Sequence, residues 1–508
     1  MFTNSVGTEG TLSATMDRHL EVERKFDVDD TTLSPSFDGL AVVARVQRAP
    51  SQQLDAVYYD TPGRDLAAHL ITLRRRTGGS DAGWHLKLPA GPDARTEVRA
   101  PLSGDDEVPA ELREVVLAIV RDRPLSPVAR ISTNRTVDQL YGVGGTELAE
   151  FADDHVTAWA DGDDAEQHWR EWELELAEQA AADGHEVGEL MGRLANRLLD
   201  AGAQPAGHGS KLARVLDQSA PAEGAEPEIE DPVHRAVAEE IDNLLTWDRA
   251  VRADVYDSIH QMRVTTRKIR SLLQSAESAF GLSDDAWILD ELRQLASVLG
   301  VARDAEVLAE RYEKALDELP VELVRGPIRD RLVEGANRRY RAGWRRSLTA
   351  MRSQRYFRML DALEDLVAAE APQLLSGEVP SADATIESGY KRVRKQAKRA
   401  DNAEVEHRDE ALHRIRKGAK RLRYTAAATG AKGVSDAAKN IQSLLGDHQD
   451  SVVSRQHLSQ QAEAAHAAGE DTFTYGLLYE READLARQCR EQLGPELKAL
   501  KRAVRKEL

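Results

Sequence analysis

The sequence predicts an α+β protein of more than one domain, with a strand-rich N-terminal half and a helical C-terminal half. The chain has 508 residues, more than one core usually organises. Apolar residues mainly alternate with polar ones from about residue 20 to 216, and recur at helical spacing from about residue 234. Between these regions, residues 218–232 are acidic and rich in Pro and Ala, as is typical of a linker. We therefore expect domains at 18–217 and 233–508.

The overall composition is that of a globular protein, with 41% hydrophobic and 31% charged residues. The formal net charge of −19 argues against a polyanion-binding protein unless the basic residues are concentrated in one place. The single cysteine, Cys489, excludes an intramolecular disulfide and fits a cytoplasmic protein. Because the sequence has neither an apolar run of about 18 residues nor a secretory signal, we expect a cytoplasmic location and no membrane partner.

In the first half, charged and apolar residues alternate, so that each strand has one charged face. Side chains of a strand point alternately to its two faces, which places Glu21, Glu23 and Lys25 together. The opposite faces carry large apolar residues such as Trp172 and Leu174. The same alternation groups the charged residues of four later strands: Arg74 and Arg76; His85 and Lys87; Arg95, Glu97 and Arg99; Glu171, Glu173 and Glu175.

Such strands can form a closed antiparallel barrel whose charged faces line the interior. Carboxylates would then hold Mg²⁺ or Mn²⁺, which prefer oxygen ligands, and Arg and Lys side chains would bind phosphate oxygens. The alternative is a half-exposed sheet whose outer face carries ordinary salt bridges. Recurrence of the pattern in five strands favours the charged tunnel. Two segments with helical spacing, Pro109 to Arg121 and Glu186 to Ala201, are expected as helices of this domain.

These residues resemble the CYTH family of triphosphate tunnel metalloenzymes over about residues 18 to 217. The first strand matches the signature E-x-E-x-K. The other matches follow in chain order: Val57-Tyr58-Tyr59-Asp60-Thr61-Pro62; Leu73, Arg74 and Arg76 of L-R-x-R; Lys87 and Pro89 of K-x-P; Arg135 in a later basic strand; Asp153, preferred over Asp154, in an aspartate strand; Glu173 and Glu175 of E-x-E; and Ser210-Lys211.

The resemblance implies an eight-stranded antiparallel tunnel that hydrolyses or cyclises triphosphates with a divalent metal, Mg²⁺ or Mn²⁺. Glu21, Glu23 and Lys25 would form the catalytic strand, and a role of Lys25 as base would require a lowered pKa. The implied metal ligands are Glu21, Glu23, Asp153, Glu173 and Glu175. The implied phosphate-binding residues are Lys25, Arg74, Arg76, Lys87, Arg135 and Lys211.

The helical half contains an internal repeat of the pattern H-x-x-R-x-x-x-[RK]-[KR]-x-R. Each copy is followed by L-G-x-x-x-D, ending at Asp304 and at Asp450. The simplest interpretation is a pair of related helical bundles in tandem. In each copy the histidine and three cations at i, i+3, i+7 and i+10 fall on one helix face, with Lys268 or Arg421 beside them. The residues are His260, Arg263, Arg267, Lys268 and Arg270 in the first copy, and His413, Arg416, Lys420, Arg421 and Arg423 in the second.

Adjacent cations on one helix face repel each other unless an anion or a neighbouring acidic helix compensates them. Asp304, Asp450 and nearby glutamates could do so as a solvated network, which is the alternative to a ligand. Recurrence of the stripe favours a polyanion in a shared groove. Nucleic acid is less favoured than polyphosphate because aromatic residues for base stacking are scarce, with Tyr424 beside one stripe.

The helical half resembles the CHAD family, the conserved-histidine α-helical domain, over about residues 230 to 508. This resemblance implies two tandem four-helix bundles with pseudo-twofold symmetry that bind inorganic polyphosphate, and an association with polyphosphate granules. The expected function is therefore metal-dependent hydrolysis of tripolyphosphate in the tunnel, with polyphosphate bound by the helices. Two alternatives stay open: a non-catalytic polyphosphate receptor, and a tunnel enzyme that acts on an organic triphosphate such as thiamine triphosphate or ATP. No protein partner is indicated.

Overall fold

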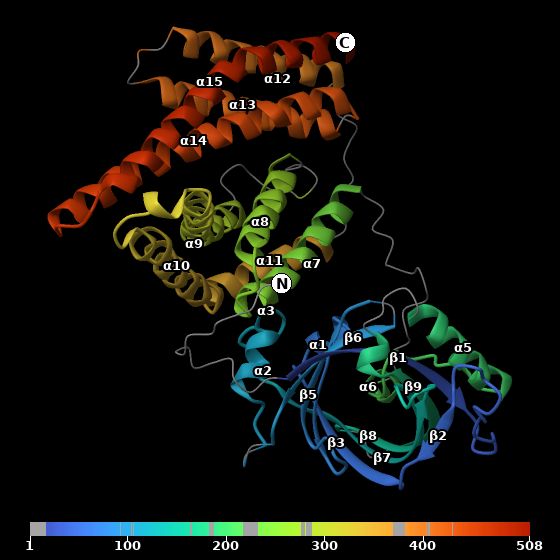
Figure 1. The fold of residues 1–508 in the computed structure, drawn as a ribbon. Helices are drawn as coiled ribbons and strands as arrows, with labels where there is room; N and C mark the ends of the chain where they lie inside the picture. The colour runs from blue at the N-terminus through green and yellow to red at the C-terminus, as the bar shows by residue number, and fades with distance from the viewer. Residues whose placement is uncertain are drawn as a thin grey trace. The chain divides into compact units, whose positions relative to one another are not determined.

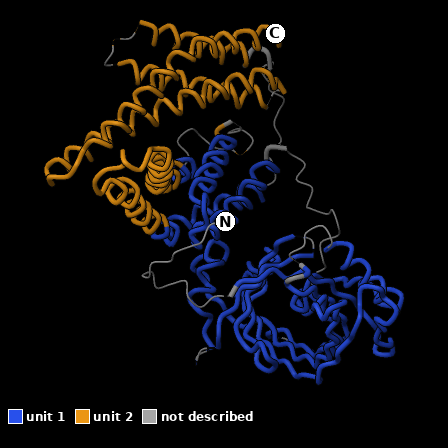
Figure 2. Tube along the Cα trace, viewed as in Figure 1, with its two compact units in different colours: residues 1–273, 287–292, 348–370 blue, residues 274–286, 293–347, 371–508 orange. Residues whose placement is uncertain are grey.

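The computed structural model forms two compact units, which are described separately (Figure 2). Unit 1 comprises residues 1–273, 287–292 and 348–370, and unit 2 comprises 274–286, 293–347 and 371–508. The predicted linker, 218–232, lies outside the described residues except for Pro232. The described residues are 17–91, 93–102, 104, 106–162, 165–181, 187–216, 232–275, 280, 287–368, 382–402, 404, 407–428 and 430–507.

The N-terminal part of unit 1 is a closed antiparallel barrel of eight strands, which confirms the predicted tunnel fold (Figure 1). The ring runs β1-β6-β5-β4-β3-β7-β8-β9 and closes because β9 pairs with β1. The short strands β2 and β10 pair with β7 and β1 outside the ring. The strands are β1 Asp17–Val28, β2 Arg45–Arg48, β3 Gln52–Asp60, β4 Thr72–Thr77, β5 Gly83–Pro89, β6 Ala94–Ala100, β7 Ser126–Tyr141, β8 Glu147–Ala160, β9 Glu166–Leu176 and β10 Gln204–Pro205.

Two hydrophobic clusters of this part lie outside the barrel, between the strands and the helices that cover them. Trp84 and Leu86 on β5 pack with Leu112 of α2, and Trp172 on β9 packs with Leu194 of α5. Alternation therefore sends the charged side chains of the same strands into the lumen. A third cluster lies on the inner face of β3, β7, β8 and β9, where Tyr58 and Trp169 pack with Leu212 of α6. The helices are α1 Asp65–Ala68, α2 Ala110–Val115, α3 Leu117–Val120, α4 Glu178–Ala181, α5 Val187–Asp200 and α6 Lys211–Val215.

The two helices predicted within this half are present, one of them in two pieces. The prediction for 186–201 corresponds to α5. The prediction for 109–121 is wrong as a single helix, because Val116 leaves the helical conformation, at φ −107° and ψ 11°, between α2 and α3. Arg121 then ends α3 at φ 57°. Its buried guanidinium is ion-paired with Asp361 and Glu364.

Unit 1 also contains helices from the C-terminal half, and ion pairs connect them to the barrel's own helices. Glu114 of α2 accepts hydrogen bonds from Arg252 Nη1, at 2.6 Å, and from Arg352 Nε, at 3.0 Å. Arg252 is held in turn by Asp248, 2.6 Å away. These helices are α7 Pro232–Arg252, α8 Ser258–Ser275, α11 Gln354–Ala368 and the first turns of α9 Trp287–Asp317.

Unit 2 contains a four-helix bundle, α12–α15, whose helices share one hydrophobic core. Val393, Ile415, Ile441 and Leu500 contribute to it from the four helices. Among the described residues, no helix is both long and apolar enough to cross a membrane. The pseudo-twofold relation between two bundles stays a prediction. Besides the rest of α9, the elements are a 3₁₀ turn Val321–Leu323, a π-helical turn Asp330–Glu334, α10 Gly335–Met351, α12 Ala382–Asp401, α13 Arg408–Ala428, α14 Lys432–Ala467 and α15 Phe473–Glu507.

Candidate active site

The barrel encloses a cavity of about 320 Å³ whose wall is almost entirely charged. This volume is within the range of small-molecule sites, about 300–1,000 Å³. Nine carboxylates and eight cationic side chains line it, so that little hydrocarbon surface is exposed to a ligand. All the residues to which the family resemblance gave a catalytic, metal or phosphate role, except Asp153, belong to this wall: Glu21, Glu23, Lys25, Arg74, Arg76, Lys87, Arg135, Glu173, Glu175 and Lys211.

The charged face of β1 is held by lysines of its own and of a neighbouring strand. Lys25 Nζ lies 2.8 Å from Glu23 Oε2 and 2.9 Å from Glu173 Oε1, and Lys87 Nζ lies 2.5 Å from Glu21 Oε2. Burial alone would lower the pKa of Lys25, but Glu173 and Glu23 outweigh burial and raise it. Lys25 therefore remains protonated at neutral pH. A role as catalytic base would require a lowered pKa, whereas the protonated amine is suited to binding phosphate oxygens.

Next to β1, on strands β9 and β8, three carboxylates surround Lys211. Its Nζ lies 2.8 Å from Asp154 Oδ2, 2.7 Å from Glu171 Oε1 and 2.8 Å from Glu173 Oε1. One oxygen from each carboxylate lies within 4.8 Å of the others, close enough to hold one metal ion. Three carboxylates are a suitable ligand set for a hard divalent cation, so these residues fit the Mg²⁺ or Mn²⁺ that the sequence predicted.

The expected preference for Asp153 over Asp154 is wrong. Arg170 holds Asp153 through two hydrogen bonds of 2.8 and 2.6 Å, and Ser34 donates a third at 2.9 Å, outside the lumen. Strand alternation instead turns Asp154 inward, where it is fully buried. Its Oδ1 and Oδ2 accept hydrogen bonds from Arg135 Nε at 2.8 Å and Arg135 Nη2 at 2.6 Å. Asp154 therefore replaces Asp153 among the candidate metal ligands, and Glu171 joins it.

A cationic wall faces these carboxylates. Arg74 and Arg76 project from β4, and Arg135 projects from β7. Arg74 donates to the Tyr58 hydroxyl at 3.3 Å, Arg76 pairs with Asp81, and Arg135 pairs with Asp154 and Glu173. Planar guanidinium groups bind phosphate oxygens in pairs, so this wall is suited to a chain of phosphates.

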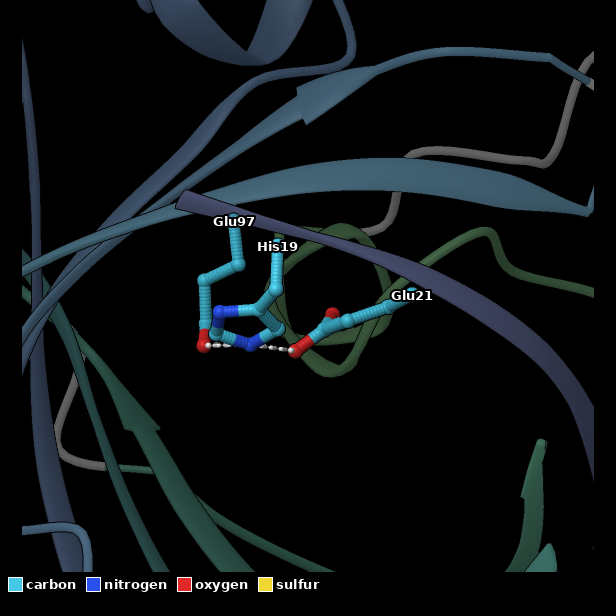
Figure 3. A group of neighbouring side chains, drawn as sticks. All are labelled: His19, Glu21 and Glu97. Carbon is cyan, nitrogen blue, oxygen red and sulfur yellow. Dashed lines mark ion pairs between the residues drawn. The ribbon is translucent and has the colours of Figure 1, made fainter. Parts of the chain in front are cut away.

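Several lumen residues were given no role by the sequence argument. Glu97 of β6 is the most engaged: His85 Nδ1 lies 2.9 Å from its Oε1, and His19 Nε2 lies 3.1 Å from its Oε2 (Figure 3). Glu150 of β8 lies beside Glu175 of β9, a predicted metal ligand, and Glu175 lies in turn beside Glu23 of β1. Burial and then Glu21 raise the pKa of Glu175 to about 7. Alternation had already grouped Glu97 with Arg95 and Arg99, and continued along β1 and β8 it would also have identified His19 and Glu150.

Acid is expected to destabilise the barrel through Glu23. Burial alone would raise the pKa of this carboxyl, but Lys25 and Lys87 outweigh burial and lower it from 4.5 to about 2. The folded state then binds fewer protons, so the stabilisation is complete above pH 4.5 and disappears as the pH falls toward 2. At about 1.4 kcal/mol per pKa unit, it is on the order of 3 kcal/mol.

This linkage can be measured by urea unfolding of the wild type and Glu23→Gln between pH 3 and 7. The variant should lose less stability on acidification than the wild type. Glu189→Gln, at an exposed position of α5, serves as the control and should follow the wild type. Equal pH dependence in wild type and Glu23→Gln would contradict the linkage.

The two cationic stripes lie on α8 and α13. In α8, Lys268 pairs with Glu240 at 3.0 Å, and Arg270 Nε donates to the Leu289 carbonyl at 3.2 Å; the other predicted residues are His260, Arg263 and Arg267. In α13, Arg423 lies 5.6 Å from the centre of the exposed Tyr424 ring. Because the stripes belong to different units, a shared groove stays a prediction. The α13 set is His413, Arg416, Lys420, Arg421 and Arg423.

The L-G-x-x-x-D segment of α14 lies against the second stripe. A side chain at Gly446 would place its Cβ 3.2 Å from Arg416 Nη2, so the glycine leaves room for this guanidinium. Burial raises the pKa of Asp450, and the nearby Arg416 and Arg311 oppose that rise. Asp450 therefore compensates part of the charge of Arg416. For this one cation, the result agrees with the alternative in which acidic residues, and not a ligand, compensate the stripe.

Comparisons with known proteins agree with this two-part organisation. A CYTH domain model matches residues 19–204, and a CHAD domain model matches residues 235–459. An uncharacterized protein of Mycobacterium tuberculosis strain H37Rv is 66% identical, covering 96% of this chain and 98% of that protein. The CHAD domain of the plant Ricinus communis is 20% identical, with TM-score 0.39, over 54% of this chain and 90% of its own. A Pyrococcus horikoshii OT3 protein is 18% identical, with TM-score 0.25, and the match covers 39% of this chain and 99% of that protein.

Proposed function

Because the chain belongs to the proteins that join a CYTH domain to a CHAD domain, we propose that its tunnel hydrolyses inorganic tripolyphosphate with a divalent metal ion. The observation that carries the proposal is that the tunnel contains both a group of carboxylates that could bind a cation and a group of arginines that could bind an anion. Asp154, Glu171 and Glu173 form a cation site, and Glu173 lines the same cavity as Arg74 and Arg76, which form an anion site. A phosphate chain with its metal ion has both kinds of charge.

When bound, the divalent metal would neutralise phosphate charge and supply an activated water for attack on phosphorus. The protein's own residues perform the other tasks. Arg74, Arg76 and Arg135 would bind non-bridging oxygens and stabilise the charge that develops on the transferred phosphoryl group. Lys25, which stays protonated, would donate hydrogen bonds to the chain. The closed barrel limits the access of bulk water to these groups.

The lysines also explain how the tunnel stays folded without a ligand. Lys25, Lys87 and Lys211 each contact at least one buried carboxylate at 2.9 Å or less. An unpaired buried charge is costly, so these contacts keep the carboxylates compensated until a metal ion arrives. A phosphate chain then provides new partners for the displaced ammonium groups. Metal and substrate are therefore expected to bind cooperatively.

The test is phosphate release from tripolyphosphate, ATP, thiamine triphosphate and long polyphosphate, each with Mg²⁺, with Mn²⁺ and with EDTA. Tripolyphosphate should be hydrolysed fastest, and EDTA should reduce the rate to background. Tight binding of tripolyphosphate without turnover would contradict hydrolysis and support the receptor alternative. Faster hydrolysis of ATP or thiamine triphosphate would contradict the inorganic substrate and support an organic one.

For the helical region, we propose binding of inorganic polyphosphate through the cationic stripes of α8 and α13. Two copies of one cationic pattern in a protein of net charge −19 support a polyanionic ligand. Phosphate chains need no base stacking, which fits the scarcity of aromatic residues beside the stripes. Such binding would associate the protein with polyphosphate granules.

A further inference from the structure

His19 adds a nitrogen donor to the carboxylates of the tunnel. It lies two residues before Glu21 on β1, so both side chains point into the lumen, and it pairs in register with Glu97 of β6. Its Nε2 lies 3.5 Å from Glu21 Oε1 and 3.1 Å from Glu97 Oε2. Figure 3 shows the imidazole between the two carboxylates, with its Nε2 directed toward both.

The spacing of these three atoms is that of ligands around one metal ion. Metal–ligand bonds of about 2.1 Å place adjacent donors about 3.0 Å apart in an octahedron and about 3.4 Å apart in a tetrahedron. The two separations from His19 Nε2, 3.1 and 3.5 Å, are close to these values. All three donor atoms lie within 4.8 Å of one another. We propose that His19, Glu21 and Glu97 form a metal position in the tunnel that takes a first-row transition ion such as Mn²⁺ in preference to Mg²⁺.

The preference follows from the ligand types. Mg²⁺ is a hard ion that binds oxygen, whereas imidazole nitrogen is a common ligand of first-row transition ions. The group around Lys211 offers only carboxylate oxygens, so the two sets differ in chemistry. Glu21 and Glu97 are 3% and 1% exposed, and removal from water strengthens their attraction for a cation. The raised pKa of the nearby Glu175 is consistent with a negative potential around Glu21.

His85 orients Glu97 and has no nitrogen left for a metal. Its Nδ1 contacts Glu97 Oε1 at 2.9 Å, and its Nε2 contacts the Asp81 carbonyl at 2.9 Å. Glu97 Oε2 is then directed toward His19. Such outer hydrogen bonds commonly position metal ligands. Arg99 also pairs with Glu97 and Lys87 pairs with Glu21, so a metal ion must replace these cations. Arg99 is the more exposed of the two, with 36% of its side chain accessible.

The test is pulsed EPR of the full-length protein loaded with Mn²⁺, which detects a directly bound ¹⁴N nucleus. The wild type should show ¹⁴N coupling. His19→Gln should lose the coupling while Mn²⁺ still binds to the carboxylates around Lys211. His168→Gln, at an exposed position of β9, is the matched imidazole control and should keep the coupling. Thermal unfolding of each variant identifies a failure to fold.

The inference rests on the proposed function in one respect, that the tunnel uses a divalent cation. Titrations should also show that His19→Gln lowers Mn²⁺ affinity at this position by about tenfold or more, with Mg²⁺ affinity unchanged. Absence of ¹⁴N coupling in the wild type, or its persistence in His19→Gln, would overturn the inference. These readouts need no turnover, so they remain informative if tripolyphosphate proves not to be the substrate.

Discussion

Replacing Glu173 by glutamine is expected to lower the rate of tripolyphosphate hydrolysis by about 10²- to 10³-fold, the usual effect of removing one preorganised electrostatic group. Glu173 contacts both the cationic side chains and the group of carboxylates in the tunnel. Its oxygens contact Lys25 and Lys211 at 2.9 and 2.8 Å, and it also pairs with Arg135. It is at the same time one of the three carboxylates grouped around a candidate metal position. Glutamine keeps the shape but removes the charge that a metal ion requires.

The measurement is the steady-state rate of phosphate release at saturating metal and substrate, with Glu166→Gln as the matched control. Glu166 is on the same strand, but its side chain is half exposed beside His168. The control should retain wild-type activity. Thermal unfolding and tripolyphosphate binding of Glu173→Gln separate a loss of chemistry from a loss of folding. A folded Glu173→Gln protein with wild-type activity would contradict the assignment of this carboxylate to the reaction.

Strand alternation in the sequence was sufficient to predict which charges line the tunnel. Glu21, Glu23 and Lys25 share a face because side chains of a strand alternate, and the structure places all three in one cavity. The error at Asp153 arose where a motif match was preferred to this rule. Phe151 packs in the outer hydrophobic cluster, so alternation assigns Asp153 to the outside and Asp154 to the lumen.

Strand pairing could not be predicted in the same way, and the details of the site depend on it. Glu97 was visible as a charged residue between Arg95 and Arg99, but its role follows from the register that places it opposite His19. Likewise, Glu173 meets Lys25 because β9 closes the ring onto β1, a contact between distant parts of the chain. Local patterns contain no information about such long-range neighbours.

In the helical half, too, local patterns predicted the elements but not which distant elements pack together. Helical spacing predicted α8 and α13 with their cationic faces, and both helices are present. The grouping of α7, α8 and α11 with the barrel was not predicted, because it depends on side-chain pairs that no motif records. Glu114 with Arg252, and Arg121 with Asp361, join segments more than a hundred residues apart.

The double charge reversal Arg267→Glu with Lys420→Glu, one substitution in each stripe, is expected to weaken binding of long-chain polyphosphate by about 100-fold or more. A hydrogen bond between charged groups contributes about 1.5–3 kcal/mol, so two lost contacts amount to at least about 3 kcal/mol. The dependence of affinity on salt should also become shallower, by about one unit of logarithmic slope for each cation that no longer contacts phosphate. A purely structural role of the stripes would not change this slope.

The matched control is Arg414→Glu with Arg487→Glu, which changes the net charge of the protein by the same amount. Arg414 is on the same helix as Lys420 but pairs with Glu410, and Arg487 is on α15 paired with Asp484. If local cation placement decides binding, the control should bind polyphosphate nearly as tightly as the wild type. Equal weakening in both double variants would show that binding follows net charge alone. Retained binding in Arg267→Glu with Lys420→Glu would assign the ligand to another surface.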